Sequence, residues 1–262
     1  MAQHGERPFA IVTGASRGIG AAYARALAAK GYDLLLVGRD KTRLDQLASD
    51  LISRHGGTAD PEVMNLAEPG AAHQLYAAAR QRRHHLDLLV LNAGFGLFGD
   101  FAAMPLPRIR EMLRLHLEVN VESVRLFLPS MIDRGSGGII IVASLAGLLP
   151  VPYLAEYAAT KAFLIAFSES LAEEIRASGV RVQVCCPGST ATDFHATAAS
   201  RPKGLFNALQ PTQVVRTSLA ALERGPTLVP IGWQGRLMAW LTRHLPRTLV
   251  VRAAAQWMKR HV

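Results

Sequence analysis

Cysteine is scarce in this sequence: the only two, Cys185 and Cys186, are neighbours. Adjacent cysteines rarely bridge each other, so a fold stapled by disulfides is excluded. The nine histidines are not paired with cysteines or carboxylates at ligand spacing, and we expect no metal site. These absences favour a protein of a reducing compartment, and we expect a cytoplasmic one.

Long apolar runs are also missing. Half of the 262 residues are hydrophobic, yet no uninterrupted run approaches the roughly 18–20 residues of a membrane span. The first ten residues, MAQHGERPFA, lack the apolar region of a secretory leader. A chain of this length can bury a full hydrophobic core, so we expect one soluble α/β domain.

Acidic residues are absent from the C-terminal part of the chain. No Asp or Glu occurs from Trp233 to Val262. The basic residues there are Arg236, Arg243, Arg247, Arg252, Lys259 and Arg260. Most of the net charge of +9 therefore belongs to this stretch. It carries no nucleic-acid-binding motif, so we expect no nucleic-acid partner.

The sequence does contain an alternation of apolar runs and helical segments. Strands are predicted at 9–12, 33–37, 59–65, 86–92, 138–144, 180–185 and 227–231. Helices are predicted near 18–30, 41–55, 69–83, 107–134, 153–178 and 211–224. This pattern predicts an α/β fold with a doubly wound, Rossmann-like parallel sheet of about seven strands. We expect a single domain over 1–262, with a core at 8–231 and a basic amphipathic helical extension at 232–262.

The stretch TGASRGIG (13–20) follows the first predicted strand. Gly14 permits a tight turn, Gly18 lets the backbone approach a ligand, and Gly20 allows close packing of helix on strand. The start of the next helix then offers N–H groups to a pyrophosphate. A purely structural glycine turn is the alternative, but the position after the first strand favours nucleotide binding.

The second strand ends in LLLVGRD, where an NAD-preferring enzyme usually carries an acidic residue. Arg39 stands there instead, and with Arg17 it could hold a 2′-phosphate through paired N–H donors. Asp40 is predicted to cap the following helix. The sequence therefore predicts NADP(H) as cofactor; the alternative is two solvated arginines near helix starts.

Tyr157 and Lys161 stand one helical turn apart in YAATKAF. A phenol has an ordinary pKa of about 10, too high for easy proton exchange near neutral pH. If both side chains line a pocket, the ammonium would favour the phenolate and make the phenol a usable acid. Otherwise Tyr157 is an ordinary residue of an amphipathic helix.

These motifs together resemble the short-chain dehydrogenase/reductase family over residues 8–230. Asn120 in LEVNV and Ser144 in IVASLAG match its catalytic asparagine and serine, and YAATK matches its Tyr-x-x-x-Lys pair. NAG (92–94) resembles the stretch beneath the adenosine ribose, and PGSTAT (187–192) the segment at the nicotinamide end. The resemblance implies these cofactor-binding residues: Gly14, Ser16, Arg17, Gly18, Ile19, Gly20, Arg39, Asn65, Leu66, Asn92, Ala93, Gly94, Tyr157, Lys161, Pro187, Gly188, Thr190 and Thr192.

One departure from the family pattern follows the third strand, where Asn65 and Leu66 replace the frequent Asp and apolar residue. An amide can still form a hydrogen bond with adenine. His116 and Glu118, just before Asn120, do not belong to the family's catalytic set, and we expect them to be surface or core residues.

The resemblance implies an NADP(H)-dependent oxidoreductase that interconverts a carbonyl and an alcohol by hydride transfer. Its substrate would be a hydrophobic ketone or aldehyde, for example a 3-oxoacyl group. Tyr157 would be the general acid/base, and Lys161 would also hold the nicotinamide ribose. Ser144 would bind the substrate oxygen, and Asn120 would hold a water of the proton relay. The alternative is a cofactor-binding regulatory or scaffold protein on the same fold, without turnover.

Three stretches are expected to form the substrate pocket: 93–98, 145–152 and 193–206, the last as a lid. Family analogy suggests a homodimer or homotetramer. The extension is predicted to form two helices divided by Pro246. Their apolar faces either pack on the domain or a partner subunit, or form a basic surface for anionic lipid or an acidic acyl carrier.

Overall fold

A computed structural model describes residues 7–191 and 208–259. Its strands form one parallel seven-stranded sheet in the order β3-β2-β1-β4-β5-β6-β7, which confirms the predicted doubly wound fold. The strands are β1 (Phe9–Thr13), β2 (Asp33–Gly38), β3 (Ala59–Val63), β4 (Leu88–Leu91), β5 (Gly137–Val142), β6 (Val180–Cys186) and β7 (Leu228–Pro230). The strand order reverses between β1 and β4, the point where such sheets bind ligands.

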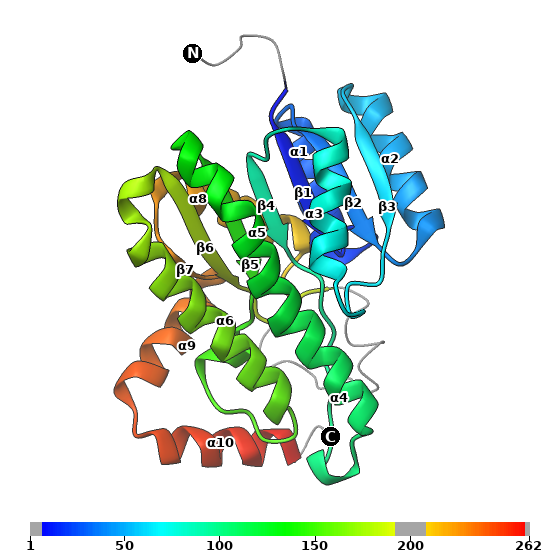
Figure 1. The fold of residues 1–262 in the computed structure, drawn as a ribbon. Helices are drawn as coiled ribbons and strands as arrows, with labels where there is room; N and C mark the ends of the chain where they lie inside the picture. The colour runs from blue at the N-terminus through cyan, green and yellow to red at the C-terminus, as the bar shows by residue number, and fades with distance from the viewer. Residues whose placement is uncertain (1–6, 192–207, 260–262) are drawn as a thin grey trace.

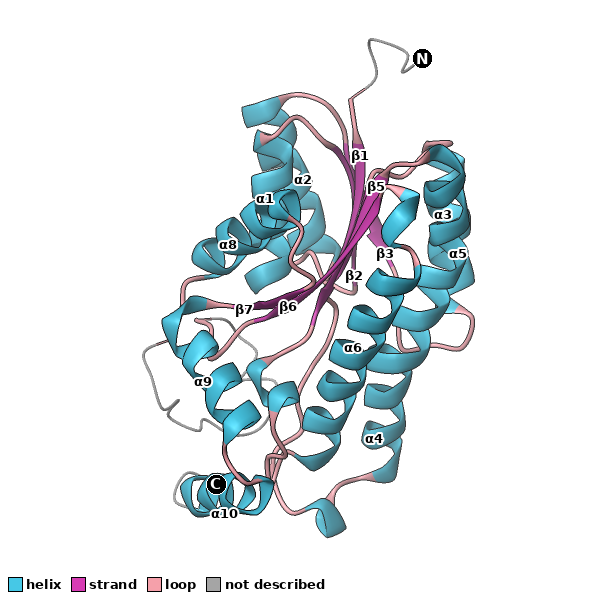
Figure 2. Ribbon diagram, turned by 90° about the vertical axis from the view of Figure 1, so that its left-hand side faces the viewer, coloured by secondary structure: helices cyan, strands magenta, loops and turns pink. Residues whose placement is uncertain are grey.

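Helices cover both faces of the sheet (Figures 1 and 2). One face packs against α1 (Gly18–Ala29), α2 (Lys41–His55) and α8 (Pro211–Arg224). The other packs against α3 (Ala71–Arg82), α5 (Val119–Arg134) and α6 (Ala155–Glu174). Short 3₁₀ turns are η1 (Phe101–Ala103), η3 (Leu145–Leu148) and η4 (Arg176–Ser178).

Burial explains why the strands are nearly continuous apolar runs. Every residue of β1, β2 and β4 is buried, as expected for strands covered on both faces. The strand predicted at 59–65 is also confirmed as β3, although it contains Pro61. β3 is the edge of the sheet, so its outer side has no neighbouring strand to receive an N–H and proline is tolerated.

The prediction of one helix over 107–134 is wrong in its middle. The chain forms α4 (Leu106–Leu113), a π-helical segment η2 (Arg114–Glu118) and then α5. The N–H of Val119 bonds to the carbonyl of Arg114, five residues back. The Asn120 side-chain amide donates hydrogen bonds to the nearby carbonyls of Leu115 and His116, at 3.0 and 2.9 Å. This competition of a side chain with the backbone accounts for the wider turn.

The C-terminal extension forms the two predicted helices, α9 (Gly232–His244) and α10 (Arg247–Lys259), with Pro246 between them. They lie at the end of the molecule opposite the N-terminus, with α10 crossing below α6 (Figure 1). None of the described helices has the length and hydropathy needed to cross a bilayer.

Candidate active site

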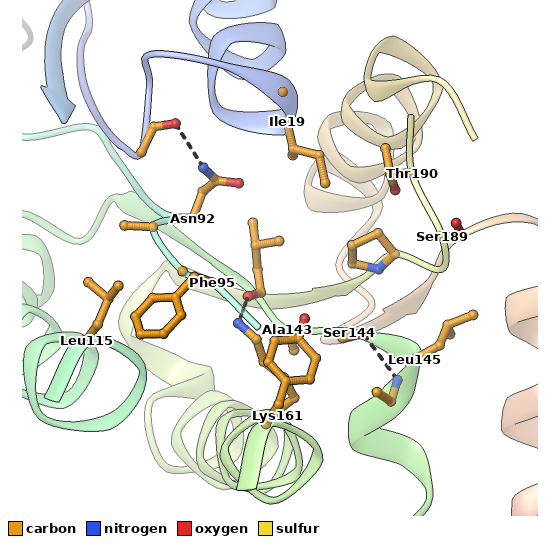
Figure 3. A pocket seen from close by; sticks show the side chains of 18 of the residues that line it. Ile19, Asn92, Phe95, Leu115, Ala143, Ser144, Leu145, Lys161, Ser189 and Thr190 are labelled. Carbon is orange, nitrogen blue, oxygen red and sulfur yellow. Dashed lines mark hydrogen bonds between the residues drawn. The ribbon is translucent and has the colours of Figure 1, made fainter. Parts of the chain in front are cut away.

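A cavity of about 550 Å³ opens at the carboxyl edge of the sheet. Its walls come from the loop after β1, the ends of β2, β4, β5 and β6, the start of α6, and the two C-terminal helices. Figure 3 shows Ile19, Asn92, Ser144 and Lys161 around this space. Distant parts of the sequence therefore meet where a doubly wound sheet binds ligands.

The glycine loop fits a dinucleotide phosphate. Gly14 and Gly18 have φ angles of 65° and 56°, which residues with a side chain rarely adopt. A β-carbon on Gly20 would lie 2.1 Å from the Gly14 carbonyl oxygen. The loop thus presents bare backbone to the cavity, and the start of α1 can offer its N–H groups to an anion. Gly20 itself is buried in packing and does not line the cavity.

The NAG stretch is tied to this loop by hydrogen bonds. The Asn92 side chain donates to the carbonyl of Thr13 at 2.9 Å. The backbone N–H groups of Asn92 and Ala93 both donate to the Thr13 hydroxyl, at 2.9 and 3.1 Å. Asn92, Ala93 and Gly94 line the cavity, as predicted. These bonds fix the ends of β1 and β4 relative to each other below the nucleotide position.

Arg17 and Arg39 both line the adenosine end of the cavity. The Arg39 side chain is 61% exposed, and its Nη1 lies 3.6 Å from Glu111 Oε1. Asp40 accepts a hydrogen bond from the Arg43 N–H at 3.1 Å, so the predicted helix cap is confirmed. Both side chains line the same cavity, and Glu111 competes with any bound anion for the Arg39 guanidinium.

Asn65 and Leu66 also line this end. Leu66 is buried. The Asn65 amide donates to Glu68 Oε1 at 2.8 Å, and its carbonyl oxygen accepts from the Ala67 N–H at 3.2 Å. The side chain is thus held in a local turn beside the cavity.

Three of the four predicted catalytic side chains lie together in the cavity wall. Tyr157 and Lys161 project from α6, with exposed fractions of 7% and 4%, and Ser144 begins the turn η3. Gly147 brings η3 against α6: a β-carbon there would lie 2.6 Å from the carbonyl carbon of Lys161. The Ser144 hydroxyl accepts from the Ala146 N–H at 3.1 Å, which leaves its own proton to donate.

Burial dominates the ionisation of the pair. Burial raises the pKa of Tyr157 to about 12, with a hydrogen bond to Ser144 acting in the opposite direction. Burial also lowers the pKa of Lys161 to about 8. The Lys161 ammonium donates to the Val142 carbonyl at 3.0 Å and lies 5.6 Å from the centroid of the Tyr157 ring. The sequence predicts that Lys161 lowers the pKa of the Tyr157 phenol, whereas in the structure burial has the larger effect and raises that pKa.

Asn120 does not share this wall: it is buried behind it, with an exposed fraction of 5%. Its amide donates to two carbonyls of the π-helical segment, those of Leu115 and His116. In this structure Asn120 therefore shapes the π turn beside α6.

His116 lies in the core, one of the two places that we expect for it. The sequence does not reveal its contact with the site: it is completely buried beside Tyr157, with their ring centroids 5.7 Å apart. The Phe95 N–H donates to His116 Nε2 at 3.2 Å, and His116 Nδ1 lies 2.9 Å from the Thr160 hydroxyl. That hydroxyl donates to the Tyr157 carbonyl at 2.8 Å.

The direction of these bonds fixes the state of the His116 ring. Nε2 accepts from a backbone N–H, so the proton of the neutral ring sits on Nδ1 and is donated to Thr160. Burial lowers the pKa of His116 well below its ordinary value, and repulsion from Lys161 lowers it further. Glu118, by contrast, is exposed.

The segment after β6 forms another part of the cavity wall. Pro187, Gly188 and Thr190, which are predicted to bind the cofactor, line the cavity. The Thr190 hydroxyl donates to the Gly188 carbonyl at 3.0 Å. Thr192 and the predicted lid at 193–206 lie outside the described residues.

Most of the remaining lining residues are apolar, although Arg108, Ser189 and Gln234 also line the cavity. Phe95 and Phe98 come from the predicted loop after β4, and Leu145, Ala146 and Val151 from the predicted stretch after Ser144. The C-terminal helices also reach the cavity, which the sequence did not indicate. Their lining residues are Gln234, Met238, Trp257 and Met258. Among residues 7–191 and 208–259, no three His, Cys, Asp or Glu side chains are grouped to hold a metal.

The model of the family described as short chain dehydrogenase matches residues 8–203. The chain belongs to the short-chain dehydrogenase family. This family binds a nicotinamide cofactor and carries out oxidation and reduction, so the protein is an oxidoreductase.

Relatives and solved structures agree with this assignment. A very-long-chain 3-oxoacyl-CoA reductase of Phaeosphaeria nodorum is 32% identical over 90% of this short-chain dehydrogenase and 72% of its own length. The ketoacyl reductase HetN of Nostoc sp. is 35% identical over 68% and 62% of the two chains, so this chain aligns with less than two thirds of that relative. A short-chain dehydrogenase from Sphingobium yanoikuyae in complex with NADPH is 28% identical, with a TM-score of 0.82 over 91% and 96% of the chains.

Proposed function

We propose that this short-chain dehydrogenase uses NADP(H) to reduce a hydrophobic carbonyl compound, of the 3-oxoacyl type, to the alcohol. The observation that carries the proposal is the single cavity, which joins the glycine loop and two arginines to Ser144, Tyr157 and an apolar wall. The names of the relatives, 3-oxoacyl-CoA and ketoacyl reductases, support the substrate class. The named NADPH complex supports the cofactor.

Each residue has a separate task in this proposal. The glycine loop would hold the pyrophosphate, and Arg17 and Arg39 the 2′-phosphate. When bound, the nicotinamide supplies the hydride. Ser144 donates a hydrogen bond to the substrate oxygen, which polarises the carbonyl and orients it. Tyr157 gives its phenolic proton to the oxygen as negative charge develops there.

The pKa of Tyr157 favours the direction of reduction. Because burial raises that pKa to about 12, the phenol keeps its proton at neutral pH, which is the form that reduction needs, although the higher pKa also makes it a weaker proton donor. Oxidation of the alcohol would instead need the phenolate, which the buried site disfavours. In this proposal Lys161 would bind the nicotinamide ribose. The predicted relay water of Asn120 is not part of it, because the Asn120 amide is bonded to the carbonyls of Leu115 and His116 behind the cavity wall.

A chain-length series of 3-oxoacyl thioesters, read by loss of NADPH absorbance, tests the proposal. We expect kcat/KM to rise with chain length because the far wall of the cavity is apolar. Tyr157→Phe should lower kcat by about 10²–10⁴, the usual contribution of a general acid, while NADPH still binds. Tyr32→Phe, outside the cavity, is the matched control and should keep full activity.

NADPH binding with no turnover of any carbonyl would instead favour the regulatory or scaffold alternative. Full activity of Tyr157→Phe would remove Tyr157 from the proton transfer. We also propose a homodimer or homotetramer in the cytoplasm, on family analogy and the lack of disulfide-forming cysteines. Sedimentation velocity and cell fractionation test these two points.

A further inference from the structure

The C-terminal helices expose large apolar side chains. Leu237, Trp240, Leu245 and Leu249 have exposed fractions of 41%, 57%, 47% and 56%. Leu237 and Trp240 belong to α9, Leu245 directly follows it, and Leu249 lies near the start of α10. Only Gly235 of α9 and Met258 of α10 are buried. Short helices gain most of their stability from packing. No other described residue covers these exposed apolar side chains, so they form an outer face that is available to a partner.

The same two helices also expose basic side chains. The exposed cations on the two helices are Arg236, Arg243, Arg247, Arg252 and Lys259. No acidic residue occurs anywhere from Trp233 to Val262. We call the four exposed apolar side chains and these five cations the tail surface. Exposed leucines and a tryptophan among cations are typical of helices that lie in the interface of an anionic membrane.

We propose that the tail surface docks on anionic lipid and that the active-site cavity is filled from the bilayer. Charge complementarity favours anionic lipid over the other possible partners of the tail surface. A two-fold contact between copies through the tail surface would place the same cations against each other, with no acidic residue to pair them. An acidic carrier protein would match the cations but would leave Trp240 and the leucines without an apolar partner.

The position of the cavity gives the docking a use. The inner sides of the same helices contribute Met238, Trp257 and Met258 to the cavity wall, so its apolar end lies directly behind the tail surface. Figure 2 shows α9 and α10 at the end of the molecule beyond the carboxyl ends of the strands. A lipid-soluble substrate could then move from bilayer to cavity without crossing water. This second clause of the proposal depends on the proposed function, whereas the docking itself does not.

Tryptophan fluorescence offers a direct readout, because all three tryptophans, Trp233, Trp240 and Trp257, lie in these helices. Phosphatidylcholine vesicles with phosphatidylglycerol should bind the protein and shift its emission to the blue. Vesicles of phosphatidylcholine alone should bind it much more weakly. Trp240→Phe should lose most of the shift while binding is kept. Binding should also weaken from 0.1 M to 1 M salt, as the Debye length falls from about 10 Å to about 3 Å.

A charge-matched pair of variants separates docking from simple basicity. The tail variant is Arg243→Gln, Arg247→Gln, Arg252→Gln. The control variant is Lys41→Gln, Arg54→Gln, Arg176→Gln, which removes exposed cations from α2 and η4. Each cation near an anionic surface changes partition about fivefold, so the tail variant should lose binding on the order of 100-fold. The control should bind like the parent.

Three results would overturn the docking: no binding at low salt, equal losses in both variants, or a parent dimer that the tail variant converts to monomers. Activity is read separately, with a short soluble 3-oxoacyl thioester and with a long-chain one dissolved in vesicles. The tail variant should keep the first and lose about tenfold or more of the second. Loss of neither activity would refute entry from the bilayer, and absence of both activities in a parent that binds vesicles would refute only the proposed function.

Discussion

Replacement of His116 is the sharpest test of how the active site is held together. His116 joins the loop after β4 to α6 through the Phe95 N–H and the Thr160 hydroxyl, and Thr160 continues to the Tyr157 carbonyl. Tyr157, Phe95, Met112 and Leu154 also form one buried apolar cluster. A break in these bonds should therefore loosen both the acid and the wall that faces it.

The size of the effect follows from the groups left behind. In His116→Leu the buried Phe95 N–H loses its acceptor, which costs about 1–3 kcal/mol. Thr160 loses one donor but keeps its own bond to Tyr157, so this loss costs about 1 kcal/mol. We expect the free energy of unfolding to fall by about 2–4 kcal/mol. A small displacement of Tyr157 should also lower kcat/KM by about tenfold to a hundredfold.

His116→Gln separates hydrogen bonding from ionisation. Its amide offers one acceptor and one donor but cannot take up a proton, so activity should largely be restored. The pKa of His116 is low in the native state because of burial, whereas the unfolded chain titrates near 6.5. Below pH 6.5 the unfolded state therefore binds a proton that the native state does not, and stability falls as pH falls.

Urea unfolding at pH 7.5 and pH 5.5 measures this difference. The parent should lose about 1.4 kcal/mol more than His116→Gln between these two values, since a single site gives at most about 1.4 kcal/mol per pH unit. Lys161 and Tyr157 face the ring, and both are common to the two proteins, so their titration cancels in the comparison. An identical pH dependence in parent and Gln variant, or a Leu variant as stable as the parent, would refute the reasoning.

Two further predictions concern the cofactor. Arg39→Ala should weaken NADPH binding about tenfold and leave NADH binding nearly unchanged. This is the low end of the effect of a charge-assisted hydrogen bond, because Glu111 already competes for the guanidinium at 3.6 Å. Fluorescence titration with both cofactors checks this, and equal losses of affinity would contradict it. NADPH affinity should also decline as pH rises through about 8, because burial lowers the pKa of Lys161 to about 8 and the side chain loses its charge there. Lys161→Arg should keep its affinity for NADPH past pH 9. An affinity of the parent protein that does not change with pH would show that the ammonium does not bind the ribose.

The features that sequence predicted well are those whose chemistry is local. The glycine spacing of residues 13–20 lies within one loop and the Tyr157–Lys161 pair within about one helical turn, so the sequence could predict that each group of residues lies together. The strands were recognisable because both faces of the sheet are buried, which makes them nearly continuous apolar runs. Even the strand with Pro61 formed, because it lies at the edge.

What the sequence did not reveal depends on partners far along the chain. The acceptor and donor of His116 come from residues 21 and 44 positions away, and no periodicity marks such a contact. The π turn depends on where the Asn120 amide finds its carbonyls. The phenol pKa was misjudged for a similar reason: the Lys161 charge is visible in sequence, but the burial that outweighs it is a property of the assembled cavity.

The C-terminal helices show the limit most clearly. Helical spacing predicted the two helices, but α10 carries apolar residues both at the cavity and at the surface, so spacing alone could not say which side meets the domain. The structure turns Trp257 and Met258 inward to the cavity and leaves Leu249 outside among arginines. The inner side of the extension is apolar because it lines the cavity. Only the apolar side chains of the outer side are then left to be covered by another surface. We therefore expect the basic outer face of the two helices, rather than the extension as a whole, to be the part that binds vesicles.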